Sequence, residues 1–239
     1  MARTARIESE TDAYYHIVSR CNNRSFLFSE GRLKDTLKDL LERAAAFSGV
    51  ELRAFCLMDN HFHLVVKVVK PETEIPADEV IRRIGVLKGP AVLGRLQASW
   101  KNLGEAALES RLAPYRRRMH RLGEFVKTFK EFVSLACKKA SPHTGSIFEG
   151  RFSSTLVEDG RYLANCIRYV EYNPIRAGIV RRAADYRWSS RNVAAANETA
   201  CLAGPVPEGW LERRVPQISQ GTVFGSYAFV REKAVAFGR

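Results

Sequence analysis

Apolar and polar side chains alternate along three short stretches in the first third of the chain. Residues 14–19 are rich in aromatic and β-branched side chains, which predicts a first strand. Residues 51–58 predict a second strand, in which alternation places every second side chain on a common face: Leu52, Ala54, Cys56 and Met58. After a two-residue turn at Asp59 and Asn60, residues 61–69 return as a third strand.

A helical repeat separates the first two of these strands. Between residues 32 and 47 the apolar positions recur at helical spacing, and Gly49 follows as a helix-ending residue. The order strand, helix, strand, strand, with a tight turn between the last two, indicates an antiparallel α+β fold rather than a doubly wound parallel sheet.

The same pattern resumes later in the chain. Residues 124–139 predict a helix with phenylalanines on one face, and residues 145–157 are strand-like. A further helix is expected from a cap at Asp159 to Asn173, where Pro174 stops it.

The segment between the two patterned regions has a different character. It contains modestly amphipathic helical stretches around residues 78–87 and 94–108, and it ends in a dense cationic run. The sequence therefore divides into three parts: a core of residues 1–70 and 122–192, a helical insertion of residues 71–121, and a basic C-terminal extension of residues 193–239.

The charge of the chain narrows its possible partners. The 239 residues include 38 Lys and Arg against 26 Asp and Glu, a formal net charge of +12 at pH 7. A surface this basic favours a polyanion, most commonly nucleic acid, although a generic solubilising charge would give the same sum. The five cysteines are scattered, and no stretch is apolar enough to span a bilayer or to act as a secretory signal. These features predict a cytoplasmic protein with reduced thiols and no membrane contact.

His61 and His63 are the first candidates for chemistry. In a strand, residues i and i+2 project from the same face, so the two imidazoles lie side by side while Phe62 points away. Two neutral imidazoles can bind one divalent ion. A His-x-His pair on a strand is more often structural, and a two-histidine site still needs a third protein ligand.

The expected helix after Asp159 offers such a ligand. Tyr169 and Asn173 stand at i and i+4 on one helical face, beside the apolar stripe that the core would bury. The amide oxygen of Asn173 could complete a metal site, and the Tyr169 hydroxyl would then lie close to it. The alternative is a tyrosine packed at the edge of the core and an asparagine at a helix end.

Four motifs in order produce a resemblance to a known family. They are YHIVSR at 15–20, MDNHFHL at 58–64, FEGRF at 148–152 and YVEYNPIRAG at 169–178, with DYRWSS at 185–190 after them. Together they resemble the REP-associated tyrosine transposases, a branch of the single-tyrosine HUH transposases. The resemblance covers about residues 12–70 and 122–192, and more loosely residues 221–230. Two departures are Cys21, where many relatives have glycine, and the long insertion.

The resemblance implies a fold, a site and a reaction. The fold would be an RRM/ferredoxin-like antiparallel sheet with helices. His61 and His63 would bind the metal, Mg²⁺ or Mn²⁺, Asn173 would stand at the position of the third ligand, and Tyr169 would be the nucleophile. The substrate would be single-stranded DNA beside a REP-like hairpin, cleaved and rejoined through a 5′-phosphotyrosine, by a bacterial, nucleoid-associated protein that is a monomer or homodimer.

Several arginines are candidate phosphate contacts, although each is equally suited to a surface ion pair. They are Arg20, Arg24, Arg151 and Arg176 in the core and Arg116, Arg117 and Arg118 in the insertion. The cationic run of the insertion could hold a hairpin stem or form a solvated helix face. Two other functions remain open: a non-catalytic nucleic-acid-binding regulator on an RRM-like fold, and a metal-dependent nuclease in which water attacks.

Overall fold

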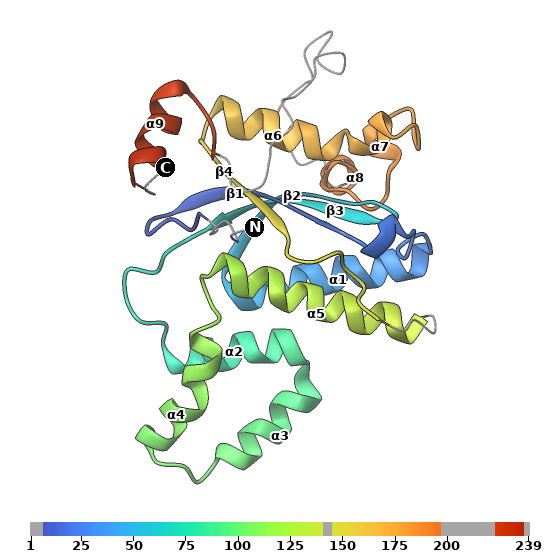
Figure 1. Ribbon diagram of the computed structural model, residues 1–239. Helices are drawn as coiled ribbons and strands as arrows, with labels where there is room; N and C mark the ends of the chain where they lie inside the picture. The colour runs from blue at the N-terminus through green and yellow to red at the C-terminus, as the bar shows by residue number, and fades with distance from the viewer. Residues whose placement is uncertain (1–6, 141–144, 197–222, 237–239) are drawn as a thin grey trace.

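The computed structural model describes residues 7–140, 145–196 and 223–236. Within these residues the strands form one sheet in the order β2-β3-β1-β4-β5 (Figure 1). The strands are β1 (Ala13–Arg20), β2 (Val50–Leu57), β3 (His61–Val68), β4 (Ser153–Val157) and β5 (Val223–Phe224). Most of the predicted C-terminal extension, including Arg213 and Arg214, lies outside the described residues.

The first four strands and two helices reproduce the predicted fold. The helices α1 (Gly31–Ser48) and α5 (Leu122–Ala140) cover one face of the sheet (Figure 1). The chain order is therefore β1-α1-β2-β3-α5-β4, and neighbouring strands among these four are antiparallel. This ferredoxin-like α+β arrangement confirms the expected fold class, and β5 adds a short parallel pairing with β4.

A second layer of helices covers the opposite face. It contains α6 (Arg161–Glu171), the short α7 (Asn173–Arg176) and α8 (Ser190–Ala196) (Figure 1). A last helix, α9 (Tyr227–Ala236), follows β5. None of the described helices is long and apolar enough to cross a bilayer.

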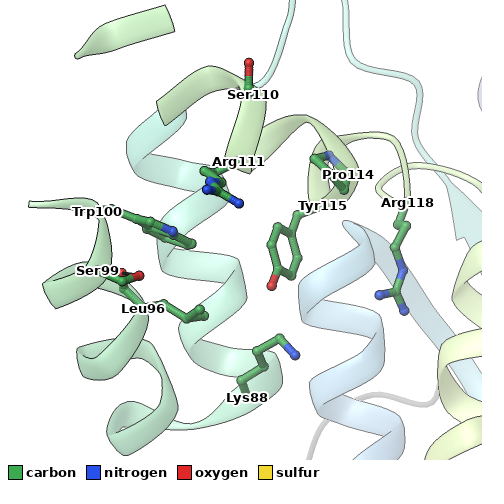
Figure 2. A pocket seen from close by; sticks show the side chains of 9 residues that line it. All are labelled: Lys88, Leu96, Ser99, Trp100, Ser110, Arg111, Pro114, Tyr115 and Arg118. Atoms are coloured by element: carbon green, nitrogen blue, oxygen red, sulfur yellow. Dashed lines mark hydrogen bonds between the residues drawn. The ribbon is translucent and has the colours of Figure 1, made fainter. Parts of the chain in front are cut away.

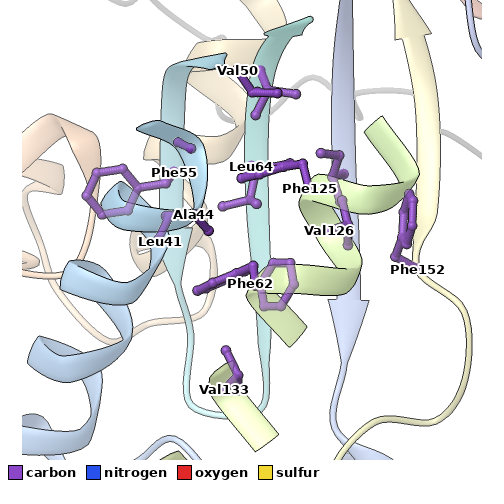
Figure 3. Packing of buried hydrophobic residues seen from close by; sticks show 14 of the residues in the cluster. Leu41, Ala44, Val50, Phe55, Phe62, Leu64, Phe125, Val126, Val133 and Phe152 are labelled. Atoms are coloured by element: carbon purple, nitrogen blue, oxygen red, sulfur yellow. The ribbon is translucent and has the colours of Figure 1, made fainter. Parts of the chain in front are cut away.

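The sheet has a separate apolar core on each face. Towards α1 and α5, Phe62 and Leu64 of β3 pack with Phe125 (Figure 3). Phe129 belongs to the same core, and its ring centroid is 5.1 Å from that of Phe62. Towards α6, smaller side chains such as Val65 pack against the buried stripe of that helix. Since β3 lies between β2 and β1 and is covered on both faces, its alternation distributes side chains between the two cores.

The predicted alternation of β2 is wrong at one point. A β-bulge between Leu52 and Ala54 shifts the register of β2 against β3. As a result Leu52 packs in the core below α1 and α5, whereas Ala54 and Cys56 pack in the core below α6. A bulge inserts one extra residue, so it inverts the side-chain pattern on either side of it.

Three other predicted boundaries also differ. The stretch 145–157 is a strand only from Ser153, because residues before it form a loop with one isolated bridge between Phe148 and Cys21. The stretch 94–108 is not one helix, since a break at Gly104 separates two. Pro174 does not end the preceding helix, because α6 ends at Glu171 and the proline occupies the first turn of α7.

The segment between β3 and α5 forms three helices around their own apolar cluster. These are α2 (Ala77–Lys88), α3 (Pro90–Trp100) and α4 (Glu105–Arg116), and they lie on the far side of the α1 and α5 layer from the sheet (Figure 1). Phe47 of α1 takes part in this cluster. Arg43 of α1 also donates to the carbonyl oxygen of Val86, at 3.1 Å, so α2 is tied along α1.

His120 joins this helical segment to the sheet. Its backbone N–H donates to the Ser48 carbonyl at 2.7 Å, its Nδ1 lies 2.6 Å from the Val69 carbonyl oxygen, and its Nε2 lies 3.0 Å from an Arg83 guanidinium nitrogen. A carbonyl only accepts and a guanidinium only donates, so these contacts require a neutral ring with hydrogen on Nδ1.

We expect stability to depend on pH through His120. Burial is the main cause that lowers the pKa of His120 below its ordinary value of 6.5. The stability that neutral His120 contributes is therefore present above the unfolded pKa, and it is lost as the pH falls from there through the folded pKa. His120→Asn removes this titration, and asparagine tolerates the positive φ of 54° at this position. Urea unfolding between pH 7.5 and pH 5 should show a smaller loss of stability in the variant; an equal loss would contradict the assignment.

Candidate active site

The two histidines of β3 lie together on the face covered by α6. The ring centroids of His61 and His63 are 5.0 Å apart, and the His63 ring is 5.7 Å from the ring of Tyr169 on α6. Phe62, between them in sequence, contacts Phe129 on the opposite side of the sheet. The alternation predicted from the sequence is thus confirmed for this strand, and it leaves both imidazoles on the face covered by α6, where His63 contacts Tyr169.

The β2–β3 turn that presents His61 is fixed by the loop after β1. The Cys21 N–H donates to the Asn60 carbonyl and the Phe28 N–H donates to the Asp59 carbonyl, both at 2.8 Å. In return, the Asn60 side-chain amide donates to the Arg24 carbonyl at 3.0 Å. The loop makes these contacts with Arg24 in the left-handed region, at φ 55°. Because Asp59 and Asn60 of the turn are both hydrogen-bonded to the loop after β1, the position at which His61 begins β3 is fixed.

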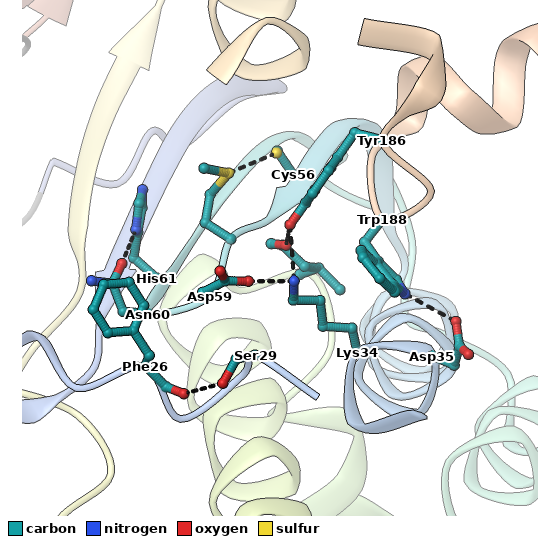
Figure 4. Close-up of polar contacts among 12 residues, drawn as sticks. Phe26, Ser29, Lys34, Asp35, Cys56, Asp59, Asn60, His61, Tyr186 and Trp188 are labelled. Atoms are coloured by element: carbon teal, nitrogen blue, oxygen red, sulfur yellow. Dashed lines mark hydrogen bonds and ion pairs between the residues drawn. The ribbon is translucent and has the colours of Figure 1, made fainter. Parts of the chain in front are cut away.

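A buried lysine on α1 also fixes the β2–β3 turn. The Lys34 side chain on α1 is only 3% exposed, and it pairs with Asp59 (Figure 4). Lys34 also donates to the Tyr186 hydroxyl at 3.1 Å, and that hydroxyl donates to the Leu57 carbonyl at 2.7 Å. The ammonium lies 4.3 Å from the centre of the Trp188 ring. The DYRWSS segment therefore joins α1 to the hairpin that carries the histidines.

Both histidines of the pair are neutral at physiological pH. Burial, followed by the charge of Arg20, lowers the pKa of His61 to about 4. Burial also holds the pKa of His63 well below its ordinary value, with the neighbouring His16 as the next cause. Neutral imidazole is the form that binds a metal ion.

Hydrogen bonds fix the tautomer of His61 and are compatible with the same tautomer of His63. His61 Nδ1 lies 2.6 Å from the Asn60 side-chain oxygen, which can only accept, so Nδ1 carries the hydrogen and Nε2 keeps its lone pair. His63 Nδ1 lies 3.0 Å from Nε2 of His16. Donation from His63 in this contact leaves its Nε2 lone pair free as well.

His16 also belongs to this cluster, although the sequence pattern did not indicate it. His16 is buried on β1, and its ring is 5.7 Å from the ring of Tyr169. The strand register would have indicated this contact. Antiparallel pairing of β1 with β3 places Val18 opposite His63 and thus brings His16 diagonally beside His63. Sequence periodicity alone did not reveal which strands pair, so the contact was missed.

Tyr169 lies against the histidines and beneath an arginine. Besides its edge contacts with His16 and His63, its ring has the guanidinium of Arg176 at 4.7 Å from its centre. Arg176 belongs to α7, which follows α6 after a bend at Tyr172. The bend therefore places a cation beside the candidate nucleophile.

Asn173 lies next to Tyr169, although not in the same regular helix. Its side-chain nitrogen donates to the Tyr169 carbonyl at 2.9 Å, which leaves the side-chain oxygen as an acceptor. Among the described residues, no group of three or more His, Cys, Asp or Glu side chains is arranged to hold a metal ion. Two imidazole nitrogens and an amide oxygen are donor types that suit a divalent ion.

The candidate arginines of the core occupy different places. Arg20 lies near enough to the histidine pair for its charge to lower the pKa of both rings, and Arg176 contacts Tyr169. Arg24 is exposed in the loop that holds the β2–β3 turn. Arg151 instead lines a groove along α5, on the opposite face of the sheet.

The three arginines of the insertion differ in how free they are. Arg116 makes ion pairs with Glu74 and Glu109, at 3.0 and 2.6 Å. Arg118 donates to the Thr128 hydroxyl at 2.7 Å. Only Arg117 of the three is exposed, so the run at 116–118 does not form a uniform cationic face.

Comparisons with known proteins agree with the motifs. Residues 9–85, which include His61 and His63 and end before Tyr169, match the family model described as "Transposase IS200 like". A search among curated proteins found no match. A solved structure of a REP-associated tyrosine transposase bound to a REP hairpin has the same fold, with a TM-score of 0.55 and 14% sequence identity. That match covers 87% of this chain and 94% of the other. The resemblance inferred from the sequence is confirmed.

We expect Lys34→Met to destabilise the protein. Methionine retains the apolar stem but removes the ammonium that pairs with Asp59 and donates to Tyr186. Loss of a buried charge-assisted contact costs about 2 kcal/mol. Lys38→Met is the matched control, because Lys38 lies one turn further along α1 and makes no ion pair within the described part of the chain. Urea unfolding measures both, and equal stabilities would contradict the role given to Lys34.

Proposed function

From the match of residues 9–85 to the IS200-like transposases, and from the fold of a REP-associated tyrosine transposase, we propose that this protein cleaves and rejoins single-stranded DNA beside a hairpin. Tyr169 is the proposed nucleophile. The observation that carries the proposal is the convergence of Tyr169 with the neutral His61–His63 pair and with the Arg176 guanidinium.

The proposed reaction is a transesterification. The Tyr169 oxygen forms a bond to the scissile phosphorus, the bond from phosphorus to the 3′ oxygen breaks, and the proton lost from tyrosine is balanced by the one gained at the 3′ hydroxyl. The product is a 5′-phosphotyrosine. Because the phosphoester bond is exchanged rather than hydrolysed, a 3′ hydroxyl can reverse the step and join strands without a nucleotide cofactor.

We expect Arg176 and Arg20 to hold the phosphate. Arg176 lies over the Tyr169 ring and is exposed on its other side, so its guanidinium can bind a phosphate oxygen beside the hydroxyl. Arg20 lies on the histidine side of the site. Cations on two sides of the tyrosine would orient the phosphate for in-line attack and stabilise its added negative charge.

The donor set supports a role for Mg²⁺ or Mn²⁺. We expect Nε2 of His61 and of His63, with the side-chain oxygen of Asn173, to hold the ion. These nitrogen and oxygen donors, without a thiolate, suit either metal. When bound, such an ion would polarise a non-bridging phosphate oxygen.

We expect Tyr169→Phe to abolish strand cleavage and to leave DNA binding nearly unchanged, because only the hydroxyl is removed. Tyr162→Phe is the matched control on α6, since Tyr162 contacts Phe224 rather than the histidines. Single-stranded hairpin substrates, followed by a denaturing gel, would detect the covalent protein–DNA adduct. Cleavage without any adduct would indicate a hydrolytic nuclease, and binding without cleavage by the wild-type protein would indicate a non-catalytic regulator.

Metal affinity tests the ligand set independently of activity. Mn²⁺ titration followed by electron paramagnetic resonance should show no specific binding to His61→Ala or His63→Ala. His16→Leu should bind Mn²⁺ about 10–100-fold more weakly, because His63 loses the hydrogen-bond partner that orients its ring. His120→Asn is the control histidine variant and should bind normally. Unchanged affinity in the His61 and His63 variants would refute the site.

A further inference from the structure

The helical insertion encloses a cavity that the proposed reaction does not use. It has a volume of about 610 Å³ and opens between α2, α3 and α4. Figure 2 shows the rings of Trp100 and Tyr115 on two sides of the space, with Arg111 and Lys88 reaching it from opposite ends. Two aromatic walls and two cations therefore face one volume.

The charge of this cavity is not balanced by the protein. Within the described residues, no carboxylate lies within ion-pair distance of Lys88 or Arg111, and no Asp or Glu lines the cavity. Lys88 has the Tyr115 ring at 5.9 Å as its recorded contact. Arg118 also reaches the cavity, but Glu124 at 3.8 Å offsets its charge.

The missing carboxylates contrast with the rest of the insertion. Glu79 pairs with Arg82 and Arg83, and Arg116 has two carboxylate partners. On these three helices Arg82, Arg83 and Arg116 are thus ion-paired, whereas Lys88 and Arg111 at the cavity are not, and neither is the exposed Arg95 away from it. Unneutralised cations concentrated in a concave, partly apolar site attract anions.

We propose that this cavity binds a nucleotide of a single DNA strand, with the base between Trp100 and Tyr115 and the phosphate on Lys88 and Arg111. Stacking on an aromatic side chain contributes about 1–3 kcal/mol per base and tolerates any sequence. The hydroxyls of Ser99 and Ser110 donate to helix carbonyls, so their oxygens remain acceptors for the N–H groups of a base. The volume lies within the range of about 300–1,000 Å³ that small-ligand pockets occupy.

The cavity is remote from the candidate active site. The insertion lies below the layer of α1 and α5, whereas α6, which carries Tyr169, covers the opposite face of the sheet (Figure 1). A nucleotide held in the cavity is therefore distinct from the one at Tyr169. Binding there does not require the cleavage activity, so the two proposals can fail separately.

Photo-crosslinking locates a bound base directly. We would use the Tyr169→Phe protein and a five-residue deoxythymidine oligonucleotide that carries one 5-iodouracil, and identify crosslinked peptides by mass spectrometry. The proposal expects crosslinks at Trp100 or Tyr115. Crosslinks confined to the α6 face of the sheet would overturn it, whatever the fate of the cleavage proposal.

Variants test the two halves of the ligand. Arg111→Gln and Tyr115→Leu should each lower the crosslink yield at this site about tenfold at subsaturating oligonucleotide, whereas Tyr115→Phe keeps the ring and should restore it. Arg95→Gln is the matched control, because Arg95 is an exposed cation of α3 that does not line the cavity. An equal loss in the Arg95 variant would mean that only net charge matters, and the proposal would fail.

Competitors distinguish the possible sources of the nucleotide. Competition by thymidine monophosphate as effective as that by the oligonucleotide would show that the cavity accepts a free nucleotide, and weaker competition would show that it prefers a strand. Either result supports nucleotide binding. Inorganic phosphate that competes as well as thymidine monophosphate would show that the base contributes nothing, which would overturn the proposal.

Discussion

The structure depends on the two-residue alternation of β3, whose side chains pack into two apolar cores, one on each face of the sheet. Phe62 and Leu64 complete the core beneath α1 and α5, while His61 and His63 face α6. A shift of this strand by one residue would exchange these sets, burying imidazoles among phenylalanines and removing the histidine pair from Tyr169. The packing of Phe62 and Leu64 on one face therefore fixes the register that keeps His61 and His63 on the other face. The apolar contacts of Phe62 thus help to position the histidines.

Features with a local period could be predicted from the sequence. The pairing of His61 with His63 follows from strand geometry, and the helix that carries Tyr169 follows from its apolar stripe. The bulge beside Arg53 could not be predicted, because a single extra residue leaves no trace in the composition of β2. His16 was missed for a different reason: its contact with His63 is made between strands, and register is a property of the assembled sheet.

Which cations of the insertion remain unpaired could not be predicted from the sequence either. A run of arginines indicates a cationic surface, yet Arg116 is neutralised by Glu74 and Glu109 while Arg111 stays unpaired. Which cation remains free is decided by how α2, α3 and α4 pack, and the spacing of charges along the chain does not encode it. The packing of the sheet thus positions the neutral histidines, whereas the packing of the insertion leaves unpaired positive charge at a separate place.

The contact between Lys34 and Tyr186 has a consequence for how the protein is made. It joins residues 152 positions apart, and Tyr186 and Trp188 cover the lysine that pairs with Asp59 in the histidine hairpin. During synthesis the hairpin leaves the ribosome long before these aromatic residues exist. Contacts of such long sequence separation form late in folding. The hairpin of the nascent chain therefore lacks these contacts until translation has passed α6. Tyr169 is synthesised before the last contacts that fix the hairpin carrying His61 and His63.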